Sequence, residues 1–153
     1  MTIEQELKTS RFHNEIHKAE LNIMFTASWL KTHVNKHLKQ YELTNEQFNV
    51  LRIIRGHEPH PVCVKDITER MIDRNSNTTR LLDKLAEKRL IRRTPSKEDR
   101  RELSISLTKA GQNLLKNIDN DEEKNKLTIS NGLSELEAQL LNVLLDKLRA
   151  SAQ

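Results

Sequence analysis

The sequence contains little of what interrupts, cross-links or anchors a chain. Its 153 residues include three glycines and three prolines, a composition that favours long helices over the many turns of a β-sandwich or barrel. A single cysteine excludes an internal disulfide framework. No apolar run approaches the roughly 20 residues of a membrane span, and the N-terminus lacks the apolar core of a signal peptide. We therefore expect a soluble, cytoplasmic protein of one domain, or of one domain with an extension.

Motifs of catalysis are missing as well. The sequence has no glycine-rich phosphate loop, no nucleophile elbow and no HExxH motif, so we predict neither an enzyme nor a bound cofactor. Histidines at helical or three-residue spacing keep a sensor metal open as an alternative. They are His13 with His17, His33 with His37, and His57 with His60 and Cys63. Pro59 and Pro61 make the last group an extended loop rather than a chelating turn, so we expect no metal site.

Cys63 offers a second alternative, which is a redox switch. A reactive thiol needs a lowered pKa and access to solvent. The neighbouring Val62 and Val64 instead favour a position within a strand, so we interpret the thiol as structural.

Positive charge is concentrated in one segment. The formal net charge is +4, but residues 65–101 hold 12 Lys and Arg against 7 Asp and Glu, a net of +5, and the remainder carries −1. A localised basic excess is typical of phosphate binding. Charge alone would equally fit a solvated basic face without a partner. The secondary structure predicted for this segment is therefore needed to decide between phosphate binding and a solvated face.

Residues 75–90 of this basic segment form a helical pattern with two different faces. On a wheel of 100° per residue, an apolar side can enter a core while a polar side offers amides, hydroxyls and cations. The apolar side holds Thr78, Leu81, Leu82 and Leu85, and the polar side holds Ser76, Asn77, Arg80 and Lys84. Asn75 is the expected N-cap. A shorter helix over 65–71 and a turn over 72–74 precede it, which is a helix-turn-helix arrangement.

Residues 91–107 alternate as β-strands do. Leu103, Ile105 and Leu107 alternate with serines, which predicts a half-buried strand. Residues 91–94 are the expected partner strand, residues 95–101 a charged connection, and residues 62–64 a possible third strand. A polar-faced helix followed by a hairpin with an arginine-rich tip predicts a winged helix-turn-helix, and DNA binding is the first hypothesis.

Helical patterns flank this centre on both sides. Residues 3–39 predict one helix of about 50 Å, longer than a small domain, so part of its apolar stripe must meet a second subunit. Residues 41–56 predict a helix opened by a capping box of Thr44 and Gln47. After the hairpin we expect a helix from 108 to about 130, and then a leucine-rich helix opened by Ser134 and Glu137.

The expected fold is therefore mainly α (α+β). It consists of a dimerisation helix over residues 1–40, a winged helix-turn-helix lobe over 41–108 and C-terminal dimerisation helices over 109–153.

Two motifs and the order of elements resemble the MarR family of bacterial transcription regulators, across nearly the whole chain. KEDRRELSISLTKAG (97–111) is similar to the family's wing pattern D-x-R-x-x-x-x-x-L-T-x-x-G, and SNTTRLLDKLAEKRLIRR (76–93) is similar to its reading helix and following strand. The matching residues are Asp99, Arg101, Leu107, Thr108 and Gly111, and then Ser76, Thr79, Arg80, Asp83 and Leu85. Ser96 and Arg89 depart from the pattern, because the family often has Asp and Gly at these positions.

The resemblance implies a homodimer whose two winged lobes stand on a platform of N- and C-terminal helices. Such proteins bind near-palindromic DNA operators, usually as repressors, and many release DNA when a small ligand or an oxidant acts. A pocket for such an effector is expected between platform and lobe, lined by Phe25, Trp29 and Phe48. A winged-helix module for protein interaction, without DNA binding, and a metal- or redox-sensing regulator are the alternatives.

The docking geometry assigns three kinds of contact to DNA. The reading helix would enter the major groove with Ser76, Asn77, Thr79 and Arg80 closest to the bases. Phosphate contacts, which position the protein without reading sequence, are expected from Lys65, Arg74, Lys84 and Arg100. Arg101, oriented by Asp99, is expected in the minor groove.

Overall fold

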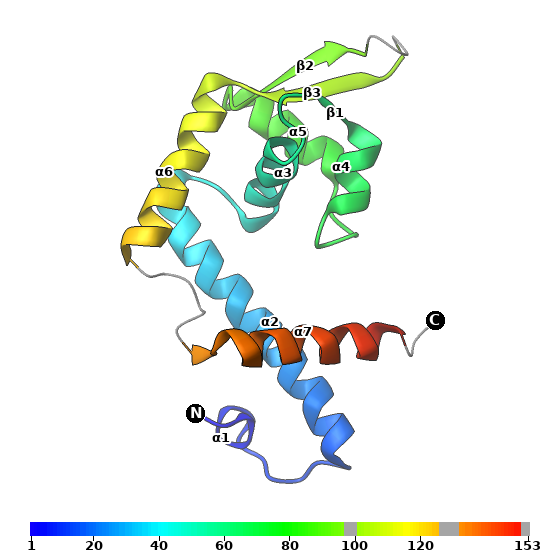
Figure 1. Ribbon diagram of the computed structural model, residues 1–153, viewed down its shortest axis with the longest axis vertical. Coiled ribbons are helices and arrows are strands. Elements are labelled where there is room, and N and C mark those ends of the chain that lie inside the picture. The colour runs from blue at the N-terminus through cyan, green and yellow to red at the C-terminus, as the bar shows by residue number, and fades with distance from the viewer. Residues whose placement is uncertain (97–100, 126–131, 151–153) are drawn as a thin grey trace. The chain divides into compact units, whose positions relative to one another are not determined.

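A computed structural model describes residues 1–96, 101–125 and 132–150 of the protein (Figure 1). The described chain is mostly helical with one small antiparallel sheet. It divides into two compact units, Met1–Gln112 and Asn113–Gln153. In the described part of the chain, no helix is both long and apolar enough to cross a membrane. The prediction of a mainly α fold around a winged helix-turn-helix is confirmed.

The prediction of one helix over residues 3–39 is wrong. Helix α1 (Ile3–Leu7) ends at Lys8, which has a left-handed backbone with φ 51°, and helix α2 (Glu15–Leu38) begins only after an irregular segment. The sequence signal for the break is Asn14, whose side chain caps α2 by accepting from the His17 N–H at 2.9 Å. At 24 residues α2 is about 36 Å long. It is followed by the 3-10 turn η1 (Lys39–Tyr41).

An ion pair fastens α1 to the start of α2. Lys18 of α2 contacts the Glu4 carboxylate, and a hydrogen bond from Lys18 is the largest cause that lowers the pKa of Glu4 to about 2. Ile3 is buried. The short helix is thus held by one apolar side chain and one charge pair.

Helix α3 (Asn45–Arg55) begins at the predicted capping box. The Thr44 hydroxyl accepts from the Gln47 N–H at 3.2 Å, and the Gln47 side-chain oxygen accepts from the Thr44 N–H at 3.2 Å. Phe48, Leu51 and Ile54 lie at helical spacing on one face of α3 and are all buried. Helix α3 therefore runs through the core of the lobe.

Three strands form one antiparallel sheet in the order β1-β3-β2. They are β1 (Val62–Cys63), β2 (Ile91–Pro95) and β3 (Leu103–Leu107). Ile105 of β3 stands opposite Val62 on one side and Arg93 on the other, and it is fully buried. Figure 1 shows helices α3, α4 (Val64–Arg70) and α5 (Thr78–Glu87) gathered on one side of this sheet. The sheet and these helices enclose the core from which the wing extends.

Two helices follow the wing. Helix α6 spans Lys109–Asn125, and the predicted end near residue 130 lies outside the described residues. Helix α7 (Glu135–Ala150) opens with the predicted capping box, because the Ser134 N–H donates to the Glu137 carboxylate at 2.7 Å and the Glu137 N–H to the Ser134 hydroxyl at 3.3 Å. The Ser134 N–H and the Ser134 hydroxyl both donate to the Glu137 carboxylate, and these two bonds lower the pKa of Glu137 below its usual value.

Candidate nucleic-acid interface

The turn between α4 and α5 is longer than the sequence predicted. Asp73 organises it, because its carboxylate accepts from the Asn75 N–H at 3.0 Å and its carbonyl from the Ser76 N–H at 3.2 Å. The helix therefore starts at Thr78, and the N-cap is Asn77 rather than Asn75. The Asn77 side-chain oxygen accepts from the Arg80 N–H at 3.0 Å.

Helix α3 fixes the beginning of this turn. The Asn49 side-chain oxygen accepts from the Ile72 N–H at 3.0 Å, and the neighbouring Met71 is buried. The turn thus has a defined position against the core, which in turn defines where α5 starts.

Helix α5 has the predicted two faces. Its buried residues are Thr78, Leu82 and Leu85. Its exposed residues are Thr79, Arg80, Asp83, Lys84, Glu87 and the cap Asn77. A helix anchored by three buried side chains and polar on its exposed face can present that face to a large polar partner.

A shallow hollow of about 420 Å³ lies beside the start of α5. Four of the predicted DNA contacts line it together, Ser76, Asn77, Arg80 and Lys84, with Thr44, Glu46, Gln47, Asp73 and Leu81 completing its wall. Thr79 does not line this hollow. The structure thus gathers most of the predicted major-groove residues at one end of one helix.

Charge in this hollow is of both signs. Lys31 of α2 pairs with Glu46 at 2.8 Å, and this hydrogen bond is the largest cause that lowers the pKa of Glu46 below its usual value. The same contact raises the pKa of Lys31. Glu46 therefore stays ionised and is paired with Lys31 of α2, while Arg80 and Lys84 of α5 bring positive charge to the same hollow.

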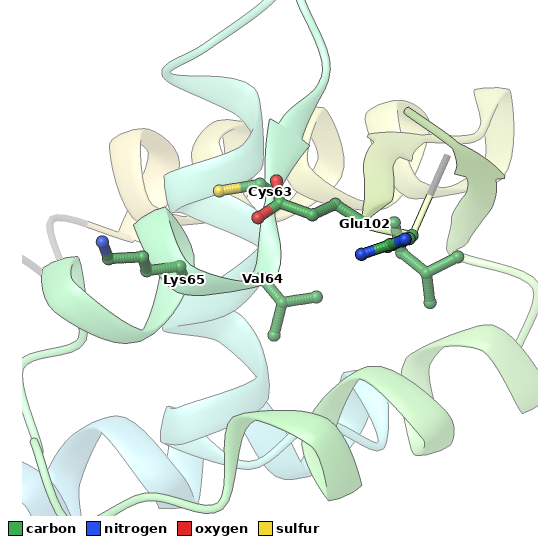
Figure 2. Close-up of a pocket in the computed structure, with 6 residues that line it drawn as sticks. Cys63, Val64, Lys65 and Glu102 are labelled. Atoms are coloured by element: carbon green, nitrogen blue, oxygen red, sulfur yellow. The ribbon is translucent and has the colours of Figure 1, made fainter. Parts of the chain in front are cut away.

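A second hollow, of about 340 Å³, lies beside the start of α4 and the tip-side end of strand β3 (Figure 2). It brings together two predicted contacts, Lys65 of α4 and Arg101 of the wing, with Cys63, Val64, Glu102 and Leu103. Figure 2 shows Glu102 extending toward Cys63, whereas Lys65 points away from Glu102. Asp99 and Arg100 lie outside the described residues. Arg74 is exposed in the turn before α5.

Cys63 has a local structural role. It belongs to β1 and is paired with Ser104, as predicted, but the strand ends there because Val64 already begins α4. Its sulfur accepts from the Asp66 N–H at 3.4 Å and so caps α4. Within the described ranges no group of three or more His, Cys, Asp or Glu side chains is placed to hold a metal ion.

Thr108 joins the end of α5, the sheet and the start of α6, a connection that sequence reasoning missed. Its hydroxyl donates to the Arg89 carbonyl at 2.7 Å and accepts from the Gly111 N–H at 3.1 Å, and its own N–H donates to the Leu90 carbonyl at 3.0 Å. Gly111 touches the same carbonyl so closely that a Cβ would lie 2.2 Å from its oxygen. These contacts explain physically why the wing motif ends in L-T-x-x-G.

Arg89 occupies the position where the family often has glycine. Its φ is 58°, in the left-handed region, directly after α5. The Leu90 N–H donates back to Leu85 and the Arg89 N–H to Ala86, which is the usual hydrogen-bond pattern of a left-handed helix end. The departure seen in the sequence is thus a non-glycine residue in a conformation that glycine adopts freely.

The three residues predicted to line an effector pocket are not brought together. Phe25 and Trp29 of α2 line a hollow of about 340 Å³ with Met1, Ile3, Glu6, Asn22 and Thr26. Phe48 is buried in the core of the lobe, with the Arg52 guanidinium 5.6 Å from its ring. It does not line that hollow.

A short helix, a turn and a polar-faced second helix, followed by a two-stranded wing, define a winged helix-turn-helix protein. Residues 43–103 match the model of the MarR family. The regulator MgrA of Staphylococcus aureus is 33% identical over 113 residues, which are 74% of each chain. The chain belongs to the MarR family. PecS of Dickeya dadantii, also named as a helix-turn-helix transcriptional regulator, is 29% identical over 74% of this chain and 69% of its own.

Solved structures agree with this membership. The chain resembles S. aureus MepR in complex with DNA, at a TM-score of 0.74 and 25% identity over 88% of this chain and 96% of that one. It resembles a mutant MarR from E. coli complexed with operator DNA, at a TM-score of 0.74 and 25% identity over 91% and 99%. The protein is therefore a winged helix-turn-helix transcription regulator and not an enzyme.

Proposed function

We propose that the protein is a ligand-responsive repressor that binds a near-palindromic DNA operator as a homodimer. The observation that carries this proposal is the outer face of α5, where Asn77, Arg80 and Lys84 gather around one hollow within a segment of net charge +5. Two relatives of the same fold, MepR and MarR, were solved with DNA bound. A regulator of this kind acts on chromosomal DNA, which in a bacterium lies in the cytoplasm.

The residues at the start of α5 have different tasks in this proposal. The Arg80 side chain takes no part in the cap and can form two hydrogen bonds to guanine in the major groove, with the exposed Thr79 beside it. The Ser76 hydroxyl is buried, so a base contact from Ser76 requires the turn to rearrange. Asn77 uses its side-chain oxygen to cap the helix, so pairing with adenine would compete with the cap. We therefore assign Asn77 chiefly to positioning, and Lys84, Lys65 and Arg74 to phosphates.

The wing supplies the minor-groove contact. Arg101 lies next to the tip of the wing and lines the same hollow as Lys65, so one strand of DNA can be held by the Lys65 ammonium while the Arg101 guanidinium enters the groove. Asp99 and Arg100 keep their assignments as an orienting carboxylate and a phosphate contact.

Dimerisation involves both helical ends of the chain, residues 1–40 and 109–153, while 41–108 carry the DNA-binding lobe. Helix α7 has no buried residue, and its leucines Leu136, Leu140 and Leu144 are between 53% and 77% exposed. Apolar surface of this extent in a folded protein marks an interface, and a second copy is the partner that also duplicates the reading helix for a palindrome.

An effector would enter beside Phe25 and Trp29. Trp29 is 49% exposed, so its ring is accessible to a small aromatic molecule. Binding there would act on α2, which also carries the Lys31 ion pair to Glu46 at the hollow beside α5.

Selection of duplexes from a random pool, followed by affinity measurement over a salt series, tests the proposal. We expect one near-palindromic sequence with half-sites about one helical turn apart, roughly 34 Å, and a steep loss of affinity as salt rises. A chain that enriches no sequence and shows no salt dependence would instead be a winged-helix module for protein interaction.

Arg80→Ala sharpens this test. It should weaken binding to the selected duplex by about tenfold or more while leaving non-specific binding nearly unchanged. Lys84→Ala is the matched comparison, because loss of a phosphate contact weakens both kinds of binding equally. If Arg80→Ala lowered the affinity for specific and non-specific DNA equally, Arg80 would be a phosphate contact rather than a base contact.

A further inference from the structure

The outer face of α5 carries two carboxylates, Asp83 and Glu87, in addition to its cations. Both are exposed on the side of the helix that DNA would approach. A free carboxylate there would repel phosphates. Each is instead paired with a cation, Asp83 with Arg93 at 2.6 Å and Glu87 with Lys84 at 3.0 Å.

The two pairs differ in what they connect. Lys84 and Glu87 lie one turn apart on the same helix, and both side chains are more than half exposed. Such a pair constrains nothing beyond its own helix, and it is worth little. Asp83 and Arg93 instead join the reading helix to strand β2 of the wing.

Arg93 is built into the sheet rather than attached to its surface. Its Cα stands opposite the fully buried Ile105, and strand alternation puts its side chain on the same face as the buried Ile91. Only 28% of the Arg93 side chain is exposed, and its Nε is buried with no hydrogen-bond partner among the described residues. The sheet therefore holds the Arg93 side chain in place, and its terminal nitrogen reaches the Asp83 carboxylate.

We propose that Asp83 and Arg93 are a positioning pair that sets the orientation of the reading helix relative to the wing. The proposal rests on the DNA-binding function above, because only a protein that places α5 and the wing on one duplex needs that orientation fixed. Contacts that read bases must be held within about 0.5 Å of their productive geometry. Arg93 acts through Asp83 and touches no base itself.

Electrostatics alone predicts the opposite result for the decisive variant. Asp83→Asn removes a negative charge from the DNA-facing helix, so simple charge reasoning predicts tighter binding. Loss of the positioning contact predicts weaker binding to the selected operator. The sign of the change therefore separates the two explanations.

The experiment compares Asp83→Asn with Glu87→Gln on the full chain, using the selected duplex and an unrelated duplex of equal length. We expect Asp83→Asn to lower the ratio of specific to non-specific affinity about fivefold, while Glu87→Gln leaves it unchanged or binds both duplexes slightly more tightly. A smaller folded fraction would reduce both affinities equally, so the ratio is insensitive to stability. If Asp83→Asn behaves as Glu87→Gln does, the positioning role is excluded.

Arg93 variants complete the cycle. Arg93→Gln should lower the ratio as Asp83→Asn does, and the double variant should be no worse than either single one, because both remove the same contact. Losses that add would show two independent effects and overturn the proposal. Failure of the unaltered protein to select any duplex would instead refute the DNA-binding function, so the two failures are distinguishable.

Discussion

The winged lobe and helix α7 both carry regularly spaced apolar residues, but only those of the lobe are buried. In the lobe, Leu51, Ile67 and Ile105 are completely buried by neighbouring elements of the same chain. In α7 no residue is buried, and Leu140 and Leu144 are more than half exposed. The lobe thus has a closed core, whereas α7 has apolar surface that the described residues of its own unit do not cover. The same driving force makes a fold in one region and an interface in the other.

The largest expected effect is at α7. Leu144→Glu should raise the dissociation constant of the dimer by at least about 100-fold, since an unpaired carboxylate in an apolar interface costs several kcal/mol. Asn142→Glu adds the same charge about 200° further round the helix and should leave the dimer intact. Sedimentation of both variants checks the prediction. Equal dissociation constants would show that this face of α7 is not the interface.

Within the lobe, Gly111→Ala should be the most damaging small substitution. The added Cβ would lie 2.2 Å from the Leu90 carbonyl oxygen, so the backbone must shift, and we expect a loss of about 2–3 kcal/mol in the free energy of unfolding. Gly56→Ala is the control, because its Cβ would meet carbonyl oxygens at an ordinary 3.5 Å. Urea unfolding measures both. Similar stabilities would mean that the contact at Gly111 relaxes freely.

Asn77→Ala tests where the reading helix begins. Loss of the cap should lower the free energy of unfolding by about 1 kcal/mol, whereas Asn75→Ala should change it by less than about 0.5 kcal/mol. Thermal unfolding of the two variants under identical conditions gives the comparison. A larger loss of stability for Asn75→Ala than for Asn77→Ala would show that Asn75 is the cap and that the helix begins where the sequence predicted.

The smallest expected effect concerns Arg89. Arg89→Gly should raise the free energy of unfolding by about 0.5–1 kcal/mol, because relief of the left-handed backbone outweighs the extra freedom of glycine in the unfolded chain. Lys88→Gly, at a residue with φ −76°, should instead be destabilising. Equal effects of the two substitutions on the urea midpoint would contradict this account.

Short-range signals predicted much of this molecule. The capping boxes at Thr44 and Ser134 mark real helix starts, and the alternation around Ile105 marks a real strand. These features could be predicted because the residues that make them lie within a few positions of one another. The gathering of Ser76, Asn77, Arg80 and Lys84 was predictable for the same reason, since they surround one helix start.

Features that depend on competition or on distant contacts were missed. Asp73 accepts hydrogen bonds from the Asn75 and Ser76 backbone N–H groups, so α5 begins later than predicted. Nothing in the local sequence pattern shows that these turn bonds form in preference to a cap at Asn75. The helix ends at Lys8 without a glycine or proline, so the helical periodicity gave no sign of the break and predicted one continuous helix. The contact of Thr108 with Arg89 joins residues 19 positions apart, and only the folded chain reveals it.

The junction at Thr108 permits movement in one direction only. Gly111 packs so closely on the Leu90 carbonyl that even a Cβ would lie 2.2 Å from its oxygen, so closer approach of the first turn of α6 is opposed by steric repulsion. It can withdraw only by breaking the hydrogen bonds from Thr108 to Leu90 and Arg89. The start of α6 therefore resists inward movement by steric repulsion and outward movement by its hydrogen bonds. A force that pulls α6 away would leave the lobe unchanged until the bonds of Thr108 break, whereas a force that pushes α6 inward would be transmitted directly to the end of α5.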